Sequence, residues 1–338
     1  MKMPVLSTAL LGLFLILSVL SSHIVWADDD SVTSKTLTLG LAKGLGHFPL
    51  LISHEKQLKP GGLSLETRYY ASGKKVLHAI LTGEVDMGVV GLGPLVFAGM
   101  EKKPFRILAS VARFSGLYKI VARKDRGIQK PADLRGKRVG VTRASSMHYF
   151  LHNFLVRSSV SEKDLAFSFK GGVASLPERL AQGEVDAIVV RRPYVASTLS
   201  KLGEAAVVFT DDDLPSNTLN VVASVRALRE KGVALQAFIN ELLEVEKRFL
   251  KNPEAADPLL FPEEAFTSRN AFDQLHAVDH KVVLEQSLII QLENIARWAA
   301  SNRFTEAAQV PNFLTFIADG SLKKANPEAV TLFRRTSP

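Results

Sequence analysis

A segment of eight residues occurs twice in this chain, and the two copies are 100 residues apart. Gly83-Glu-Val-Asp-Met-Gly-Val-Val90 returns as Gly183-Glu-Val-Asp-Ala-Ile-Val-Val190, with six of eight positions identical. Each copy follows a segment with helical spacing and precedes a proline, Pro94 or Pro193. This spacing is too long for a solenoid repeat. It predicts two α/β lobes that use the same helix–turn–strand–turn–helix unit.

Strand-like and helix-like segments alternate on both sides of the repeat. Predicted strands lie at 36–41, 63–69, 85–90, 105–111, 138–142, 166–169, 185–190, 206–209 and 219–223. Helices are predicted between them, including 48–57, 176–181 and 193–202, and from residue 226 to the end. Strands that alternate with helices are typical of a mostly parallel α/β sheet.

The first 27 residues have the layout of a secretory signal peptide. Lys2 supplies a positive charge, an apolar run extends from Val5 to Val25, and Ala27 precedes three aspartates. This layout predicts cleavage after Ala27 and a flexible leader at 28–35. The alternative is an uncleaved anchor, because about 20 apolar residues are also enough to cross a bilayer. Either interpretation places the rest of the chain outside the cytoplasm.

Cysteine content and charge exclude several functions. The chain has no cysteine, which excludes disulfide scaffolds, thiolate metal sites and cysteine nucleophiles. Lys and Arg number 42 against 34 Asp and Glu, a net charge of +8. Such a surplus is typical of proteins that meet nucleic acid, anionic membranes or small anions. Because an exported protein rarely meets nucleic acid, we expect no nucleic acid but an anionic small molecule or a membrane surface.

Over nearly all of residues 36–332, the chain resembles the solute-binding components of ABC importers. The group that it resembles includes the nitrate-, taurine- and alkanesulfonate-binding proteins. Besides the export signal and the repeat, the matching segments are Leu39–Leu50, Ser72-Gly73, Asp133-Leu-Arg-Gly-Lys-Arg-Val139, Ser145-Ser146 and Pro193. The same family includes pyrimidine synthases of thiamine biosynthesis, which rely on a cysteine-rich motif. The lack of cysteine disfavours that enzyme here.

The resemblance implies a two-lobed α/β fold of the type II periplasmic-binding class, with a ligand cleft between the lobes. Lobe 1 is then residues 36–122 plus 220–338, with a helical C-terminal region, and lobe 2 is residues 123–219. Two crossovers, near 122–124 and 217–220, join the lobes. The resemblance also implies a periplasmic location, a permease in the inner membrane as partner, and neither catalysis nor a cofactor. We expect a monomer.

Turns at the carboxyl ends of the predicted strands supply candidate ligands for an anion. Ligands of open α/β sheets bind at this edge, and helix N-termini with free N–H groups bind anions. The turn residues predicted to contact ligand are Gly46, His47, Ser72, Gly73, Gly93, Ser145 and Ser146. The planar guanidinium group suits sulfonate, carboxylate or phosphate. The arginines that follow predicted strands are Arg113, Arg143, Arg191 and Arg192. Ordinary helix caps and solvated surface arginines are the alternative interpretations.

Other titratable residues fit structural roles. Asp86 and Asp186 stand at the entries of the two repeated strands, and we expect each to bond the preceding turn rather than to act as an acid–base pair. His148 and His152 are four residues apart, which suits zinc on a helix face, but no third ligand is evident. We therefore predict no metal site and expect His148 to donate a hydrogen bond.

The sequence thus predicts a periplasmic solute-binding protein for a small organic anion, such as a sulfonate, nitrate or taurine-like compound. Two alternatives remain: an enzyme on the same scaffold, and a membrane-linked ligand sensor. An enzyme needs a perturbed carboxylate or histidine beside a nucleophile. A sensor keeps its N-terminal segment uncleaved.

The mature N-terminus tests the signal-peptide prediction. We expect exported material to begin at Asp28, because the apolar run ends in the small-residue cleavage pattern of a signal peptide. N-terminal sequencing of the exported protein measures this directly. An intact segment 1–27 in the membrane fraction would show that it is an anchor.

Overall fold

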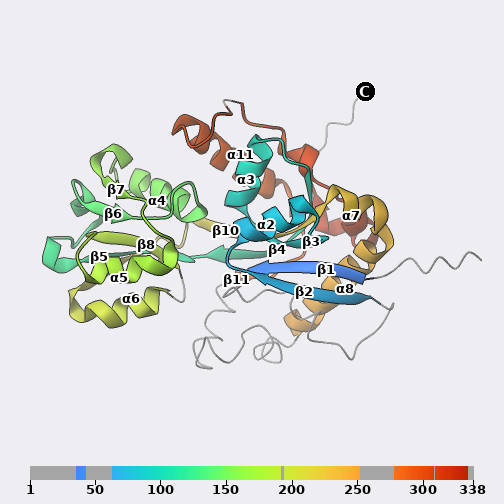
Figure 1. The fold of residues 1–338 in the computed structure, drawn as a ribbon, viewed down its shortest axis with the longest axis horizontal. Coiled ribbons are helices and arrows are strands. Elements are labelled where there is room, and N and C mark those ends of the chain that lie inside the picture. The colour runs from blue at the N-terminus through green and yellow to red at the C-terminus, as the bar shows by residue number, and fades with distance from the viewer. Residues whose placement is uncertain (1–35, 43–62, 192–193, 252–277, 308, 334–338) are drawn as a thin grey trace, which may run out of the picture. The chain divides into compact units, whose positions relative to one another are not determined.

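The computed structural model describes residues 36–42, 63–191, 194–251, 278–307 and 309–333. The predicted signal peptide and leader, the predicted helix at 48–57 and Pro193 lie outside these ranges. Two main sheets, each with helices packed on it, make up the described chain (Figure 1). Within these ranges no helix has both the length and the apolar character needed to cross a membrane.

The first sheet takes strands from widely separated parts of the chain. In spatial order its described strands are β11 (Val278–Asp279), β4 (Phe105–Ser115), β10 (Pro215–Ser224), β3 (Met87–Gly91), β1 (Thr36–Ala42) and β2 (Ser64–Tyr70). β1 is parallel to β2 and β3, whereas β10 is antiparallel to β3 and β4. A short separate ladder joins β12 (Leu284–Glu285) to β13 (Val330–Thr331). We call the part built on the first sheet lobe 1.

The helices of lobe 1 share one apolar core with its sheet. They are α2 (Gly73–Thr82), α3 (Leu92–Met100), α7 (Val225–Glu230), α8 (Gly232–Lys251), α11 (Gln286–Ser301) and α12 (Gly320–Ala325). In α8, Leu235, Phe238, Ile239 and Leu242 are fully buried, because their spacing places them on one helix face. The region after residue 226, predicted to be helical, also contains β11, β12 and β13. Strands of two residues are too short to leave a pattern in the sequence.

The second sheet belongs to lobe 2 and is covered on both faces. Its described strands, in spatial order, are β7 (Ala166–Ser168), β6 (Arg138–Gly140), β8 (Ala187–Arg191), β5 (Tyr118–Arg123) and β9 (Ala206–Phe209). In β8, Val189 packs into the core that holds α4 (Ser146–Arg157). Ile188 and Val190 pack on the other face, with α5 (Leu176–Ala181) and α6 (Tyr194–Leu202). Burial on both faces makes this strand a continuous apolar run.

Most strands of each sheet run in one direction, as predicted, but an antiparallel strand whose direction the sequence did not indicate interrupts each sheet. In lobe 2, β6 is parallel to β7 and β8, but β5 is antiparallel to β8 and β9. β10 has the corresponding antiparallel place in lobe 1. A strand buried on both faces is apolar throughout whichever way it runs. The sequence pattern therefore carried no information on direction.

The two crossovers between the lobes lie earlier in the chain than predicted. β4 ends at Ser115 in the first sheet and β5 begins at Tyr118 in the second, so the first crossover is at 116–117. The return crossover lies between β9 and β10, at 210–214. The error arose because β5 was not predicted as a strand, and most of its residues were assigned to lobe 1.

The repeated octapeptide is part of a longer repeat with a constant offset of 100 residues. In lobe 1, Gly40 of β1 pairs with Gly88 of β3, and in lobe 2 Gly140 of β6 pairs with Ile188 of β8. The ladders β1–β2 and β6–β7 keep the same offset. Each lobe therefore contains the same three parallel strands in the same register.

Each copy of the octapeptide begins with a glycine in the left-handed region. Gly83 has φ 77° directly after α2, and Gly183 has φ 73° just after α5. A side chain is rarely tolerated at such φ values, whereas glycine adopts them freely. This glycine ends the helix and turns the chain towards the following strand.

The aspartate of each copy ties its strand to the neighbouring parallel strand. The Asp86 carboxylate accepts hydrogen bonds from the Thr38 N–H and hydroxyl, both at 2.9 Å, and the Asp86 N–H donates to the Thr38 carbonyl at 3.1 Å. Asp186 repeats the backbone exchange with Arg138, at 2.9 and 2.8 Å. The prediction that these residues bond the preceding turn is wrong. Their partners are 48 residues earlier, because the strand entry lies beside the adjacent strand.

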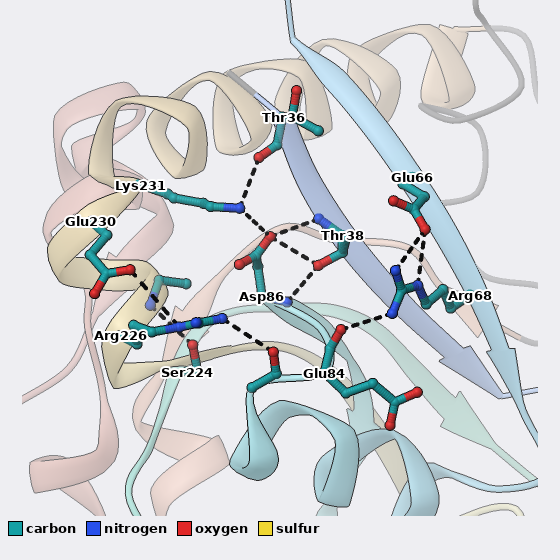
Figure 2. A network of polar contacts seen from close by, with 12 residues as sticks. Thr36, Thr38, Glu66, Arg68, Glu84, Asp86, Ser224, Arg226, Glu230 and Lys231 are labelled. Atoms are coloured by element: carbon teal, nitrogen blue, oxygen red, sulfur yellow. Dashed lines mark hydrogen bonds and ion pairs between the residues drawn. The ribbon is translucent and has the colours of Figure 1, made fainter. Parts of the chain in front are cut away.

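The cation beside each aspartate comes from a different place. Lys231, between α7 and α8, donates to Asp86 at 2.8 Å, as Figure 2 shows. In lobe 2 Arg138 itself donates to Asp186, also at 2.8 Å. Burial raises the pKa of Asp86, but the hydrogen bonds from Lys231 and Thr38 outweigh burial and lower the pKa below its usual range. Asp86 is thus a buried, ionised link between β1, β3 and the α7–α8 junction.

Removing this link tests its contribution to stability. We expect Asp86→Ala to lower the free energy of unfolding by about 3 kcal/mol, because buried hydrogen-bond donors and a partly buried cation lose their acceptor. Asp186→Ala removes the matching group, but we expect a smaller loss because its Arg138 partner is 46% exposed and can be hydrated. Urea denaturation of both variants measures the difference. Equal losses of unfolding free energy in the two variants would show that the greater burial of Lys231 than of Arg138 does not matter.

Candidate functional site

Three helices begin close to one another, two in lobe 1 and one in lobe 2. α2 begins after the N-cap Ser72, α3 begins after Gly91, and α4 begins after the N-cap Ser145. A Cβ atom built on Gly73 would lie 3.9 Å from the Gly91 amide nitrogen. Each helix start carries partial positive charge. Their convergence produces a positively polarised region at the strand ends.

The start of α3 contacts lobe 2 directly. The Leu92 N–H donates to the Asn217 side-chain oxygen at 3.2 Å, and the Gly93 N–H donates to the Ser146 hydroxyl at 3.3 Å. Pro94, the next residue, has no N–H group. The first amide donors of α3 are thus directed to a side chain of β10, in the same lobe, and to the first residue of α4, in lobe 2.

Tyr118 and Arg191 extend this contact on the lobe 2 side. They are opposite each other in the β5–β8 ladder, and the Tyr118 hydroxyl is hydrogen-bonded with the Ser146 side chain. Burial raises the pKa of Tyr118 to about 12, while the Arg191 charge and the Ser146 hydrogen bond oppose this rise. Tyr118 is therefore a neutral phenol at physiological pH, with an arginine beside it.

The turn before α4 is held by side chains of the helix itself. The Ser145 hydroxyl accepts from the His148 N–H at 3.3 Å and donates to the Thr142 carbonyl at 2.7 Å. Ala144 has φ 52°, an uncommon value for a residue with a side chain, and its N–H donates to His148 Nδ1 at 3.3 Å. His148 accepts this bond, so the prediction that it acts as a donor is wrong at Nδ1. The bond instead stabilises the left-handed turn at Ala144 that directly precedes Ser145 and Ser146.

His148 also lies in an aromatic contact between the lobes. Its ring centroid is 5.1 Å from that of Trp298 in α11 and 5.0 Å from that of Phe304. Burial lowers the pKa of His148 to about 4, although Glu162 opposes this shift. Glu162 Oε1 lies 3.7 Å from His148 Nε2 and 3.5 Å from His152 Nδ1. Among the described residues, however, no three histidine or acidic side chains are arranged to hold a metal ion.

The predicted arginines differ in their surroundings. Arg113 forms an ion pair with Glu285 and a hydrogen bond with Ser287, and it lowers the pKa of Glu285. The exposed Arg143 guanidinium lies 5.3 Å from the Phe304 ring centroid and also near Phe169. Arg191 is half-buried at the end of β8, opposite Tyr118. Arg191 is thus placed, through its neighbour Tyr118, beside the start of α4.

The structure brings together Gly73, Gly93, Ser146 and Arg191, and places Ser72 and Ser145 as caps at the same helix starts. The predicted residues Gly46, His47 and Arg192 lie outside the described residues. Sequence reasoning missed Tyr118 and Asn217. The apolar run Ile120-Val-Ala122 could have indicated a buried strand, but only strand register places Tyr118 opposite Arg191.

Solved structures share this architecture. The alkanesulfonate-binding protein SsuA from Xanthomonas axonopodis pv. citri, bound to MOPS, superposes with a TM-score of 0.70 over 84% of this chain and 98% of its own, at 19% identity. The desulfurization enzyme DSZB superposes with a TM-score of 0.65 over 87% of this chain and 99% of its own, at 15% identity. The fold is that of periplasmic binding proteins, on which an enzyme also occurs.

Sequence comparison identifies the family. Residues 46–256, more than half of the chain, match the family model described as NMT1/THI5 like, and the chain belongs to that family. It is 25% identical to the taurine-binding periplasmic protein of Escherichia coli (strain K12) over 201 residues, 58% of this chain and 61% of that protein. The chain thus spans about three fifths of the length of the curated relatives that it matches.

The low pKa of His148 makes stability depend on pH. The unfolded chain takes up a proton at the usual histidine pKa of 6.5, but the folded protein does so only near pH 4. The folded state therefore loses stability as pH falls from 6.5 towards 4. We expect His148→Phe to reduce the difference in unfolding free energy between about pH 7 and about pH 5. Urea denaturation at the two pH values measures it; an unchanged difference would show that His148 titrates normally.

Proposed function

We propose that this protein is the solute-binding component of an ABC importer for a small organic anion of the sulfonate class. The anion is held where the starts of α2, α3 and α4 converge, with Arg191 beside it. Ligand binding favours the form in which both lobes contact the anion. The protein works in the periplasm and passes its ligand to a permease in the inner membrane.

The observation that carries the proposal is the meeting of helix starts from two lobes. α2, α3 and α4 are 10, 9 and 12 residues long, so each has a developed dipole. A guanidinium from lobe 2 adds a full positive charge. Because one group of donors comes from each lobe, an anion between them stabilises the closed arrangement more than the open one. A positively polarised junction of this kind suits an anion and disfavours a cation.

Family membership supports the choice of ligand class. The taurine-binding periplasmic protein of Escherichia coli and the alkanesulfonate-binding SsuA are named for sulfonates, and both resemble this chain. The export signal predicted at 1–27 supports the periplasmic location. A permease partner and a monomeric state follow from the same class of protein and belong to this proposal.

The described site favours binding over catalysis. His148, the buried histidine nearest the helix starts, has Nδ1 occupied by the Ala144 N–H and is neutral. Asp86 and Asp186 are hydrogen-bonded at the strand entries, at the opposite end of the strands from the helix starts. Since an enzyme shares this fold, any sulfonate that binds should also be recovered and checked for chemical change.

Calorimetry with taurine and short alkanesulfonates tests the proposal. We expect Arg191→Ala to weaken binding of the best of these compounds roughly 10- to 150-fold, because a charge-assisted hydrogen bond contributes about 1.5–3 kcal/mol. The matched control is Arg297→Ala, which removes an equal charge from an exposed face of α11. We expect the control to bind like the parent.

Three outcomes would overturn the proposal. These are binding of none of the sulfonates, a preference for a cationic compound, or equal binding by the parent and Arg191→Ala. Desulfonated product in the recovered ligand would favour the enzyme instead.

A further inference from the structure

One hydrogen bond joins the two lobes at the point where the ligand is proposed to bind. The Gly93 N–H of α3 donates to the Ser146 hydroxyl at 3.3 Å, and Ser146 is the first residue of α4. Leu92 already donates to Asn217, and Pro94 has no N–H. Gly93 therefore supplies the amide donor of this helix start that reaches across to lobe 2.

The Ser146 hydroxyl is not needed by its own helix. Ser145 is the N-cap of α4 and accepts the His148 N–H, so the helix start is capped without Ser146. Tyr118 is a second partner of Ser146, because its buried hydroxyl is hydrogen-bonded with the Ser146 side chain. The side chain of Ser146 thus links a lobe 1 amide to a lobe 2 phenol.

The residue at position 93 permits this approach because it is glycine. A Cβ atom built there would lie 3.0 Å from Ser146 Oγ and 3.2 Å from the Ser146 amide nitrogen. These distances are shorter than most Cβ contacts, so a side chain would push the lobes apart by a few tenths of an ångström. The Gly93 backbone of lobe 1 and the Ser146 side chain of lobe 2 are therefore in direct contact.

We propose that the contact between Gly93 and Ser146 is a latch that holds part of the ligand-free population closed, and that a ligand oxygen displaces it. The Ser146 oxygen occupies the place on the Gly93 amide that an oxygen of the anion then takes. This step rests on the proposed function, because it assumes that the ligand binds at the start of α3. The contact itself involves only groups of this chain.

The latch lowers ligand affinity, since only molecules with the Gly93 amide released can bind. One ordinary hydrogen bond shifts an open–closed equilibrium roughly 2- to 13-fold. The anion can still close the lobes fully, because it contacts donors on both sides. Apart from the partner of the Gly93 amide, the latched and liganded proteins thus share the closed arrangement and differ in how much of the population is closed.

Distance measurement between spin labels tests the latch in the absence of ligand. The chain has no cysteine, so Lys324→Cys in α12 of lobe 1 and Ser200→Cys in α6 of lobe 2 can be labelled uniquely. Both positions are exposed. We expect Ser146→Ala and Gly93→Ala each to shift the ligand-free distance distribution towards the open form, with the open-to-closed ratio rising roughly 2- to 13-fold. With a saturating sulfonate, both should return to the closed distance of the parent.

The control is Ser175→Ala, which removes a lobe 2 hydroxyl that bonds only within its lobe, to the Gly172 carbonyl. We expect its distribution to match the parent. An unchanged distribution in Ser146→Ala overturns the latch, even if Gly93→Ala opens the lobes, because the effect would then be steric. If sulfonates fail to bind but Ser146→Ala still opens the ligand-free protein, the latch stands and the proposed ligand class falls.

Discussion

A buried carboxylate at the entry of a parallel strand is the interaction on which each lobe depends. Asp86 and Asp186 exchange hydrogen bonds with the backbone of the neighbouring strand, so each fixes the register of two strands at once. A shift by one residue would turn every side chain to the opposite face of the sheet. Because register is fixed at one end, the glycines and serines at the other end occupy defined positions. The aspartates at one end of the strands consequently determine where the helix starts of the site lie at the other end.

Local features of the site could be predicted from the sequence. Serine at a helix start and glycine after a helix act within a few residues, so Ser72, Ser145 and Gly83 were visible without the fold. The octapeptide repeat indicated two similar lobes. Strand direction, crossovers and the contact of Gly93 with Ser146 depend on pairings over tens of residues or more. These left no local pattern, and they were missed or misplaced.

The surroundings of the predicted arginines could not be read from the sequence either. Each follows a predicted strand, and the sequence alone favours Arg143, which closely precedes the predicted helix start at Ser145 and Ser146. Arg113 is paired with Glu285, a residue 172 positions away. Arg143 lies over aromatic rings from both lobes. Arg191 is set apart only by standing opposite Tyr118, which is a consequence of strand register. Which groups surround each arginine is therefore a property of the folded chain.

The constant offset of 100 residues makes positions 91 and 191 equivalent in the two lobes. Position 91 carries glycine and position 191 carries arginine, each at the end of the strand that contains the second half of the octapeptide. The two lobes thus have similar backbones at this position, but only the lobe 2 residue carries a charge. The Asn217 side chain packs against the glycine, where a Cβ atom would lie 2.9 Å from Asn217 Nδ2, whereas position 191 carries the guanidinium charge. An arginine at position 91 would require Asn217 to move, so packing around the glycine confines the charge to the lobe 2 copy of this position.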